Sequence, residues 1–406
     1  MSFITVCIIH QSSENLKETL GSLKGNENFI KDIIYTGKVQ NKYERDIRFL
    51  ELNTENRACL RNICIREAKG EYILWLSDTS YIEETTLEEY DQILREFKDV
   101  DIIYPNEIII DLYGEEKIKN YKDWYQNESE LIQGLTLEEF IPQWGVLTKK
   151  EIFDRIGLFD EDFEDYEFYR FLAFNLKKIK LKHSDESFTT NRITESFIDT
   201  SFRSKTLRDF VGIYDWKKEI FPLLNWEKNE KLALGTAYTT IGEKLERYYD
   251  LLNASDYYKR SILSFHNQYS LKKLIDVYIS MGEFDKALYF TKKQGLKDEE
   301  IKKYTAFIND LKKLVQELEN FVKKGKIKDL LSSINDIVSV YEGAPIYNIL
   351  GVVHFILEDY ENSFRFLTKA VTMNPEKEEY VENLFEVGKI INKESKIQSL
   401  LNRLKS

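Results

Sequence analysis

The first half of the chain alternates short apolar runs with segments whose apolar residues recur at helical spacing. Runs typical of strands cover 3–9, 32–35, 46–50, 71–76 and 100–104. The intervening patterns predict a helix capped by Ser12 or Ser13 and ending near residue 23, then helices over 57–68 and 85–97. Uninterrupted apolar strands are typical of sheets covered on both faces. We therefore expect a mostly parallel, Rossmann-like α/β sheet.

The chain from 106 to 182 is less regular. The segment 106–140 is polar and aromatic without a clear period, which suggests a hairpin and a mobile excursion over the ligand-binding edge. Beyond it we expect a strand over 142–148, a helix over 149–155, a helix opening near Glu164, and a short closing strand over 179–182.

From about Leu207 the strand signals fade and long amphipathic patterns take over. The clearest segment, Ala344 to Pro375, resembles one tetratricopeptide repeat, with small residues where two helices would cross and a proline at the end. Weaker repeat candidates cover 271–293, 238–262 and 312–340. We therefore expect an α/β domain over 1–206, a connecting helical segment over 207–231, and an all-α helical-repeat domain over 232–406.

Composition narrows the class of protein. A chain of 406 residues that is 42% hydrophobic can build two or three cores. A net charge of −12 argues against a general binder of nucleic acid or of anionic membranes. No apolar run approaches the roughly 20 residues that a membrane span needs. The 3 cysteines are too few for a disulfide framework, so we expect free thiols and a cytoplasmic location.

The stretch from Gly157 to Arg170 holds the most informative polar residues. A Gly-Leu-Phe-Asp turn precedes the acid pair Glu164-Asp165, which opens an apolar helix. A helix N-terminus favours negative charge, and a carboxylate there can serve as a general base. The alternative is that these acids only cap and solvate the helix. Glu167 and Arg170 are spaced for a pair on one helix face.

A second segment upstream points the same way. Arg61-Asn62 lies in a predicted helix, and Ala68-Lys69-Gly70-Glu71-Tyr72 leads into a buried strand ending at Ser77-Asp78. In order and spacing, these motifs together with Glu164-Asp165 resemble the inverting family 2 glycosyltransferases, which have the GT-A fold. The resemblance covers roughly the first half of the chain. It implies transfer of a sugar from a nucleotide-sugar to a hydroxyl group.

The resemblance also implies roles for individual residues. Asp165 matches the catalytic base, which Glu164 would orient or tune. Arg61 and Asn62 match the Arg-Asn pair of the family, and Arg61 would reach the donor phosphates unless it forms an ordinary ion pair. Asp78 matches the acid that contacts the donor ribose.

Other residues would line the donor and acceptor sites. His10 ends the first strand and Tyr35 ends the second, where the family binds the nucleotide base, although a lone histidine there is often structural. Arg192 lies where family members often have a segment that covers the diphosphate. Trp144 and Gly145 fall beside the acceptor site, and Trp144 would form its wall or pack in the core.

The acidic motif that would bind a metal ion is incomplete in this chain. Members of the resembling family bind Mn²⁺ or Mg²⁺ through an acidic motif at the end of this strand, and such ions prefer carboxylate oxygens. Here Thr79 follows Asp78, so only one acid of the motif remains. A divalent cation would therefore be held by Asp78 with phosphates and water, or would be absent.

Three functional readings follow. The first is a bacterial-type glycosyltransferase, with a UDP-sugar as donor, whose helical repeats recruit a protein acceptor and which modifies Ser or Thr of flagellin or another surface protein. The second is a transferase that acts on glycan or lipid precursors. The third is a degenerate scaffold that binds nucleotide-sugar without catalysis. A homodimer is one of the assemblies that we consider.

Overall fold

The computed structural model describes residues 3–11, 15–38, 47–125, 128–135, 140–193, 199–293 and 295–405. Its contacts divide the chain into two units, 1–199 and 200–406. Helix α7 (Ser201–Ile213) belongs to the second unit, so the domain boundary predicted after residue 206 falls inside a helix.

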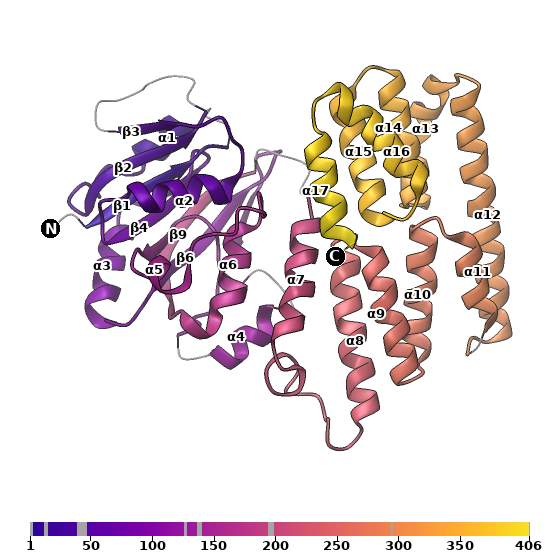
Figure 1. Cartoon of the computed structure of the whole chain (residues 1–406), viewed down its shortest axis with the longest axis horizontal. Helices are drawn as coiled ribbons and strands as arrows, with labels where there is room; N and C mark the ends of the chain where they lie inside the picture. Colours follow the sequence, from indigo (N-terminus) through magenta and orange to yellow (C-terminus); the bar gives the residue numbers. More distant parts are fainter. Residues whose placement is uncertain are drawn as a thin grey trace. The chain divides into compact units, whose positions relative to one another are not determined.

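The N-terminal unit is built on one mixed sheet (Figure 1). Its strands are β1 (Ile4–Ile9), β2 (Ile30–Gly37), β3 (Ile47–Glu51), β4 (Tyr72–Ser77), β5 (Ser80–Ile82), β6 (Ile102–Ile110), β7 (Glu116–Lys119), β8 (Val146–Lys149) and β9 (Leu181–Arg192). Their order is β3-β2-β1-β4-β8-β6-β9-β5, and β7 pairs with β6 outside this path. The predicted α/β class is confirmed.

The strands β3, β2, β1 and β4 are parallel, and the central strand β1 is buried on both faces. Successive side chains of β1 point to opposite faces. Ile4, Val6 and Ile8 join a core cluster with residues of α1 (Leu16–Gly21) and α3 (Thr86–Glu96). On the other face, α2 (Arg57–Glu67) packs against β1 and β2. Burial on both faces explains the uninterrupted apolar runs.

The rest of the sheet is mixed, so the expectation of a mostly parallel sheet holds for only one half. β8 is antiparallel to both β4 and β6, and β5 is antiparallel to β9. The predicted hairpin is confirmed as β6–β7, whereas α4 (Glu128–Leu135) was not predicted. The closing strand β9 runs far beyond residue 182 and pairs with β6 in parallel. Two further helices, α5 (Ile152–Ile156) and α6 (Glu167–Asn175), follow β8.

Every regular element described in the C-terminal unit is helical, which confirms the predicted all-α class. After α7 and a short π-helical turn, Trp216–Ile220, come α8 (Glu230–Arg247), α9 (Leu251–Ser264), α10 (Gln268–Ser280), α11 (Phe284–Lys293), α12 (Asp298–Lys323), α13 (Ile327–Val340), α14 (Ala344–Ile356), α15 (Tyr360–Met373), α16 (Glu378–Ile390) and α17 (Glu394–Lys405). The clearest predicted repeat coincides with α14 and α15, which pack against each other.

A small residue does lie where α14 meets α15. A Cβ placed on Gly351 would come within 2.4 Å of the Leu367 side chain, so this position has no room for a larger residue. The Ser363 hydroxyl donates a hydrogen bond to the Gly351 carbonyl at 2.8 Å. The helix pair is therefore as the sequence predicts, while its kinship to tetratricopeptide repeats stays a prediction.

Two smaller observations complete the fold. No helix in the described part of the chain is long and apolar enough to cross a membrane. The three cysteines, Cys7, Cys59 and Cys64, are free, as predicted.

Candidate active site

Three residues predicted for the donor site come together at the carboxyl ends of the parallel strands. His10 follows β1, Tyr35 lies near the end of β2, and Asp78 follows β4. The His10 Nδ1 atom lies 2.9 Å from Asp78 Oδ2 and 2.7 Å from the Tyr35 hydroxyl. The Tyr35 hydroxyl donates to Asp78 Oδ2 at 3.0 Å. We refer to these residues as the His10–Tyr35–Asp78 cluster.

The Asp78 carboxylate is turned inward. It is fully buried, and its second oxygen, Oδ1, accepts the Gln11 backbone N–H at 2.8 Å. Burial first, and then the negative charge of Asp78, raise the pKa of Tyr35 far above its ordinary value, so the phenol stays protonated. Gly37 has φ +127°, and a Cβ there would lie 2.3 Å from the Cβ of His10. Gly37 therefore allows His10 to reach Asp78.

A second group of predicted residues lies where the loop before α6 crosses α2. The Asn62 amide donates to the Phe159 carbonyl at 3.0 Å and accepts the Phe159 N–H at 2.9 Å. The Asn56 side chain, which caps α2, donates to the Glu161 carbonyl at 2.7 Å. These bonds fasten the acidic loop to α2. Asn62 is buried, and its amide is hydrogen-bonded to the loop. It therefore anchors the loop and does not face a nucleotide-sugar donor.

The predicted base lies directly after this anchor. The Arg57 N–H donates to the Glu164 carbonyl at 3.1 Å, and the Arg57 guanidinium forms an ion pair with Asp165. The Asp165 side chain is 31% exposed. Among the residues that the structure describes, both of its polar contacts fall on Oδ1, from Arg57 and from the Tyr166 N–H at 2.8 Å. Oδ2 is therefore the oxygen with which an incoming hydroxyl can interact. Glu164 itself is half-buried.

Tyr166, which joins Asp165 to α6, has a left-handed backbone with φ 69° and ψ 12°. A residue with a side chain rarely adopts this conformation, and such strain is commonest at functional sites. Here the bend lets the Tyr166 N–H reach back to the carboxylate of the preceding residue. The conformation is therefore consistent with a loop shaped to present Asp165.

Arg61 is not placed to reach a phosphate. Its side chain is fully buried, and its Nε donates to Glu167 Oε1 at 2.6 Å. The guanidinium carbon lies 4.5 Å from the centre of the Trp144 ring and 4.9 Å from that of Trp75. Burial lowers the pKa of Arg61, while the Glu167 carboxylate opposes this effect. Of the two readings of Arg61, the structure favours the ion pair, in a buried form.

The same cluster changes the interpretation of two other residues. Trp144 is only 4% exposed, so its ring packs in the core and does not form the wall of an open acceptor site. The Glu167 carboxylate forms an ion pair with Arg61, whereas Arg170 pairs with Asp160 at 2.9 Å. The helical spacing of Glu167 and Arg170 therefore did not predict their partners. Glu167 pairs with Arg61 because it lies on the buried face of α6.

Gly145 and Arg192 occupy contrasting positions. The Gly145 N–H donates to the Trp75 carbonyl at 2.8 Å, and its own carbonyl accepts the Tyr90 hydroxyl at 2.8 Å, so its backbone groups are used inside the sheet. Arg192 ends β9, and its backbone N–H donates to the Thr79 carbonyl at 3.0 Å. Its side chain is 36% exposed and pairs with Glu18 at 3.1 Å. Arg192 therefore lies next to Thr79 with its guanidinium partly exposed.

The His10–Tyr35–Asp78 cluster and the Asp165 loop share one edge of the sheet. β1, β2, β3 and β4 are parallel, so all four end at the same edge. Helix α2 runs from the end of β3 back to the start of β4, so its first residue, Arg57, also lies at this edge. Ligands of open α/β sheets bind beyond the carboxyl ends of the strands. The fold thus brings the predicted donor residues and the predicted base to the expected side.

The residues present do not fit a divalent cation at Asp78. Both oxygens of this buried carboxylate already accept hydrogen bonds from protein groups. Thr79, which stands where the second acid would be, is buried and donates to the Gln11 side chain at 2.9 Å. In the described part of the chain, no three His, Cys, Asp or Glu side chains are grouped so that they could hold a metal ion.

Three contributors to this site were not predicted: Arg57, Glu167 as a buried partner, and Gln11. One signal was available for Arg57, because it precedes Arg61 by four residues and so lies on the same face of α2. No local signal pairs Arg61 with Glu167, which is 106 residues away in sequence. Sequence spacing finds neighbours along a helix but not across the fold.

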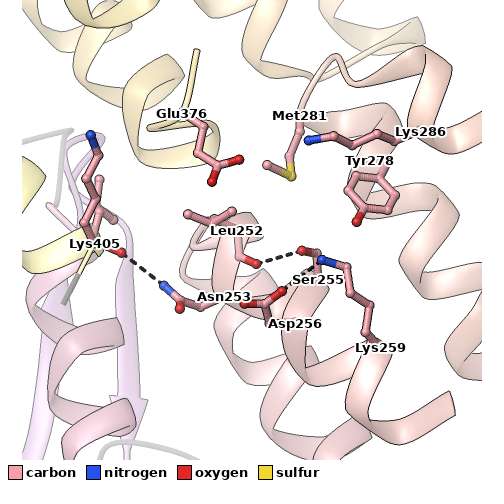
Figure 2. A pocket seen from close by; sticks show the side chains of 11 residues that line it. Leu252, Asn253, Ser255, Asp256, Lys259, Tyr278, Met281, Lys286, Glu376 and Lys405 are labelled. Atoms are coloured by element: carbon pink, nitrogen blue, oxygen red, sulfur yellow. Dashed lines mark hydrogen bonds and ion pairs between the residues drawn. The ribbon is translucent and has the colours of Figure 1, made fainter. Parts of the chain in front are cut away.

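The C-terminal unit has a separate hollow of about 490 Å³ (Figure 2). Residues of α9, α10, α11 and α17 and of the turns after α10 and α15 line it. Lys259 pairs with Asp256 at 2.9 Å, and the ammonium groups of Lys259 and Lys286 lie 5.7 Å and 5.8 Å from the centre of the Tyr278 ring. The size of the hollow is in the range of ligand pockets. Its charged groups suit a polar ligand.

No family model matches this chain. No curated protein matches it either. Among solved structures it resembles S. aureus TarS 1–349 in complex with UDP-GlcNAc, with a TM-score of 0.41 and 14% identity over 66% of this chain and 90% of that chain. A structure titled simply S. aureus TarS gives a TM-score of 0.40 and 12% identity over 66% of this chain and 54% of that chain. A likeness this weak assigns no function.

Proposed function

We propose that the N-terminal unit is an inverting glycosyltransferase that transfers a sugar, hexosyl or N-acetylhexosaminyl, from a nucleotide-sugar to a hydroxyl group. The motif order that resembles family 2 glycosyltransferases supports this proposal. UDP is the first carrier to test because it is the commonest in that family. The observation that carries the proposal is the position of Asp165, accessible and fastened to the start of α2 at the carboxyl edge where His10 and Asp78 also lie.

The geometry suggests a simple chemical step. The acceptor hydroxyl gives its proton to Oδ2 of Asp165 while its oxygen bonds to the anomeric carbon of the sugar. The bond from that carbon to the nucleotide diphosphate breaks on the opposite face, so the configuration inverts. Arg57 and the Tyr166 N–H hold Oδ1 and orient the carboxylate. General-base assistance of this kind contributes about 100-fold to 10,000-fold to the rate.

The C-terminal unit is proposed to recruit the acceptor. Arrays of helix pairs form extended surfaces that suit protein partners, and the hollow beside Lys259 and Lys286 offers charged groups for a polar peptide segment. A protein acceptor modified on Ser or Thr, of the flagellin or surface-protein type, agrees with this arrangement. A glycan or lipid-precursor acceptor is the alternative within the same reaction class.

A second candidate function is a nucleotide-sugar-binding scaffold without catalysis. The inward orientation of Asp78 and the ion pair between Asp165 and Arg57 favour it. The two functions differ in one measurable respect, because only the enzyme releases a nucleoside diphosphate from its donor.

The test is a panel of nucleotide-sugars with diphosphate release as the readout. The enzyme should release diphosphate slowly from one donor through hydrolysis, and Asp165→Asn should abolish this release. Asp162→Asn is the matched control, because it makes the same change on an exposed acid three residues earlier in the same loop. Turnover that survives in Asp165→Asn would refute the base, and nucleotide binding without release would favour the scaffold.

The acceptor proposal needs its own variant. Lys259→Glu with Lys286→Glu in the full chain reverses the charge of the hollow far from Asp165 in sequence. We expect donor hydrolysis to stay unchanged, whereas transfer to a co-purified protein rich in Ser and Thr should fall. Equal transfer by the wild type and the double variant would contradict recruitment through the hollow and would favour glycan or lipid acceptors.

A further inference from the structure

The end of β4 lacks the chemistry of a metal site, although the resembling family uses one there. Asp78 Oδ1 accepts the Gln11 N–H at 2.8 Å, and Oδ2 lies 3.0 Å from the Tyr35 hydroxyl and 2.9 Å from His10 Nδ1. Because the carboxylate is fully buried, a cation could coordinate it only after these contacts broke. A divalent cation that keeps several waters would also need space at this oxygen.

The charge of a donor diphosphate must then be balanced by side chains. Arg192 is next to Thr79 through a backbone hydrogen bond of 3.0 Å, and its guanidinium is partly exposed. Its partner Glu18 is exposed as well, and an exposed ion pair contributes about 0–1 kcal/mol. A diphosphate can therefore compete with Glu18 for Arg192, since guanidinium groups bind phosphate oxygens in pairs.

His10 is the other group suited to this role. Its Nδ1 faces the buried Asp78 and Tyr35, and its side chain is 16% exposed. The accessible part of the ring is thus the edge opposite Nδ1, which carries Nε2.

We infer that this chain binds the diphosphate of its donor without a divalent cation, through Arg192 and His10. This inference rests on the proposed function, since it concerns the same donor site. It differs from the family pattern in assigning Asp78 to the protein interior and leaving the diphosphate to side chains of the protein.

The test titrates UDP, or the nucleoside diphosphate that the donor panel selects, into the full chain by calorimetry, with EDTA and with Mn²⁺. We expect dissociation constants that agree within about threefold, well below the tenfold change that corresponds to about 1.4 kcal/mol. Mn²⁺ electron paramagnetic resonance should show no signal from protein-bound metal beyond that of the Mn²⁺–nucleotide complex. Binding that requires Mn²⁺ would overturn the inference and leave the glycosyltransferase proposal intact.

A variant pair assigns the contact. Arg192→Gln should weaken UDP binding about tenfold, which corresponds to about 1.4 kcal/mol, and should leave uridine binding unchanged. Arg95→Gln is the matched control, because Arg95 is also an exposed arginine paired with a carboxylate, Asp91 at 2.6 Å. Equal UDP affinity in both variants would remove Arg192 from the site. No binding of any nucleoside diphosphate in either buffer would overturn the donor class itself, and this inference with it.

Discussion

Two aspartates at the same edge of the sheet have opposite surroundings. Asp78 is fully buried, and both of its oxygens accept hydrogen bonds from protein groups. Asp165 is 31% exposed, and in the described part of the chain its polar contacts fall on one oxygen. The sequence assigns both to the active site, yet their environments suit them to different tasks.

The comparison shows that the fold gives two side chains of the same type different roles. A fully buried carboxylate that accepts hydrogen bonds on both oxygens stabilises the structure around it and is not accessible to a ligand. A carboxylate held at one oxygen keeps a free lone pair in a fixed direction, as a base requires. Asp78 therefore positions His10 and Tyr35, whereas Asp165 is the carboxylate that we propose as the base.

The largest expected effect is on catalysis at Asp165. Asp165→Asn should lower turnover by about 100-fold to 10,000-fold while changing the free energy of unfolding by about 1 kcal/mol or less. Steady-state diphosphate release and urea unfolding measure the two quantities. A large loss of stability with unchanged turnover would show that Asp165, like Asp78, is structural.

Two arginines of α2, Arg57 and Arg61, extend the comparison. Arg61 and Glu167 form a fully buried pair, whereas Arg57 and Asp165 are partly exposed. Glu167→Ala should cost about 3–5 kcal/mol of unfolding free energy, because it leaves a buried guanidinium without its partner. Replacing both residues, Arg61→Met with Glu167→Ala, should recover a measurable part of this loss. Urea unfolding of the single and double variants checks the prediction, and a loss below about 1 kcal/mol for Glu167→Ala would contradict it.

A direct test of the comparison removes each aspartate in turn. Asp78→Ala should lower the free energy of unfolding by about 2–4 kcal/mol, because the Tyr35 hydroxyl and the Gln11 N–H lose their acceptor in the interior. Asp165→Ala should cost about 1 kcal/mol or less. Thermal unfolding of the two variants side by side separates them, and equal losses would mean that the two sites do not differ as described.

The smallest effect concerns pH. Burial and the nearby Asp78 raise the pKa of Tyr35 in the folded protein, so the folded state holds this proton more tightly than the unfolded state. This contribution is complete below the unfolded pKa of about 10 and is lost as pH rises above it. Between pH 8 and 10.5, the wild type should lose about 1 kcal/mol more unfolding free energy than Tyr35→Phe. Urea unfolding at both pH values measures this, and identical losses would remove Tyr35 as a titrating group.

Most local structure of the candidate site was predictable. The apolar runs predicted β1 and β4, and with them the positions of His10 and Asp78 at strand ends. The acid pair was expected at a helix start, and α6 begins two residues after Asp165. These predictions hold because strand and helix periodicity are set by neighbouring residues.

The sequence by itself determined the two structural classes, an α/β unit followed by helix pairs, because hydrophobic periodicity is a local property. Only the tertiary structure decided which polar residues face inward. Arg61, Trp144 and Asp78 resemble exposed site residues in sequence, yet burial and partners far along the chain make them internal. The reason is physical: a charged side chain can be buried only where the fold supplies a counter-charge or hydrogen bonds, and those come from segments that sequence spacing does not connect.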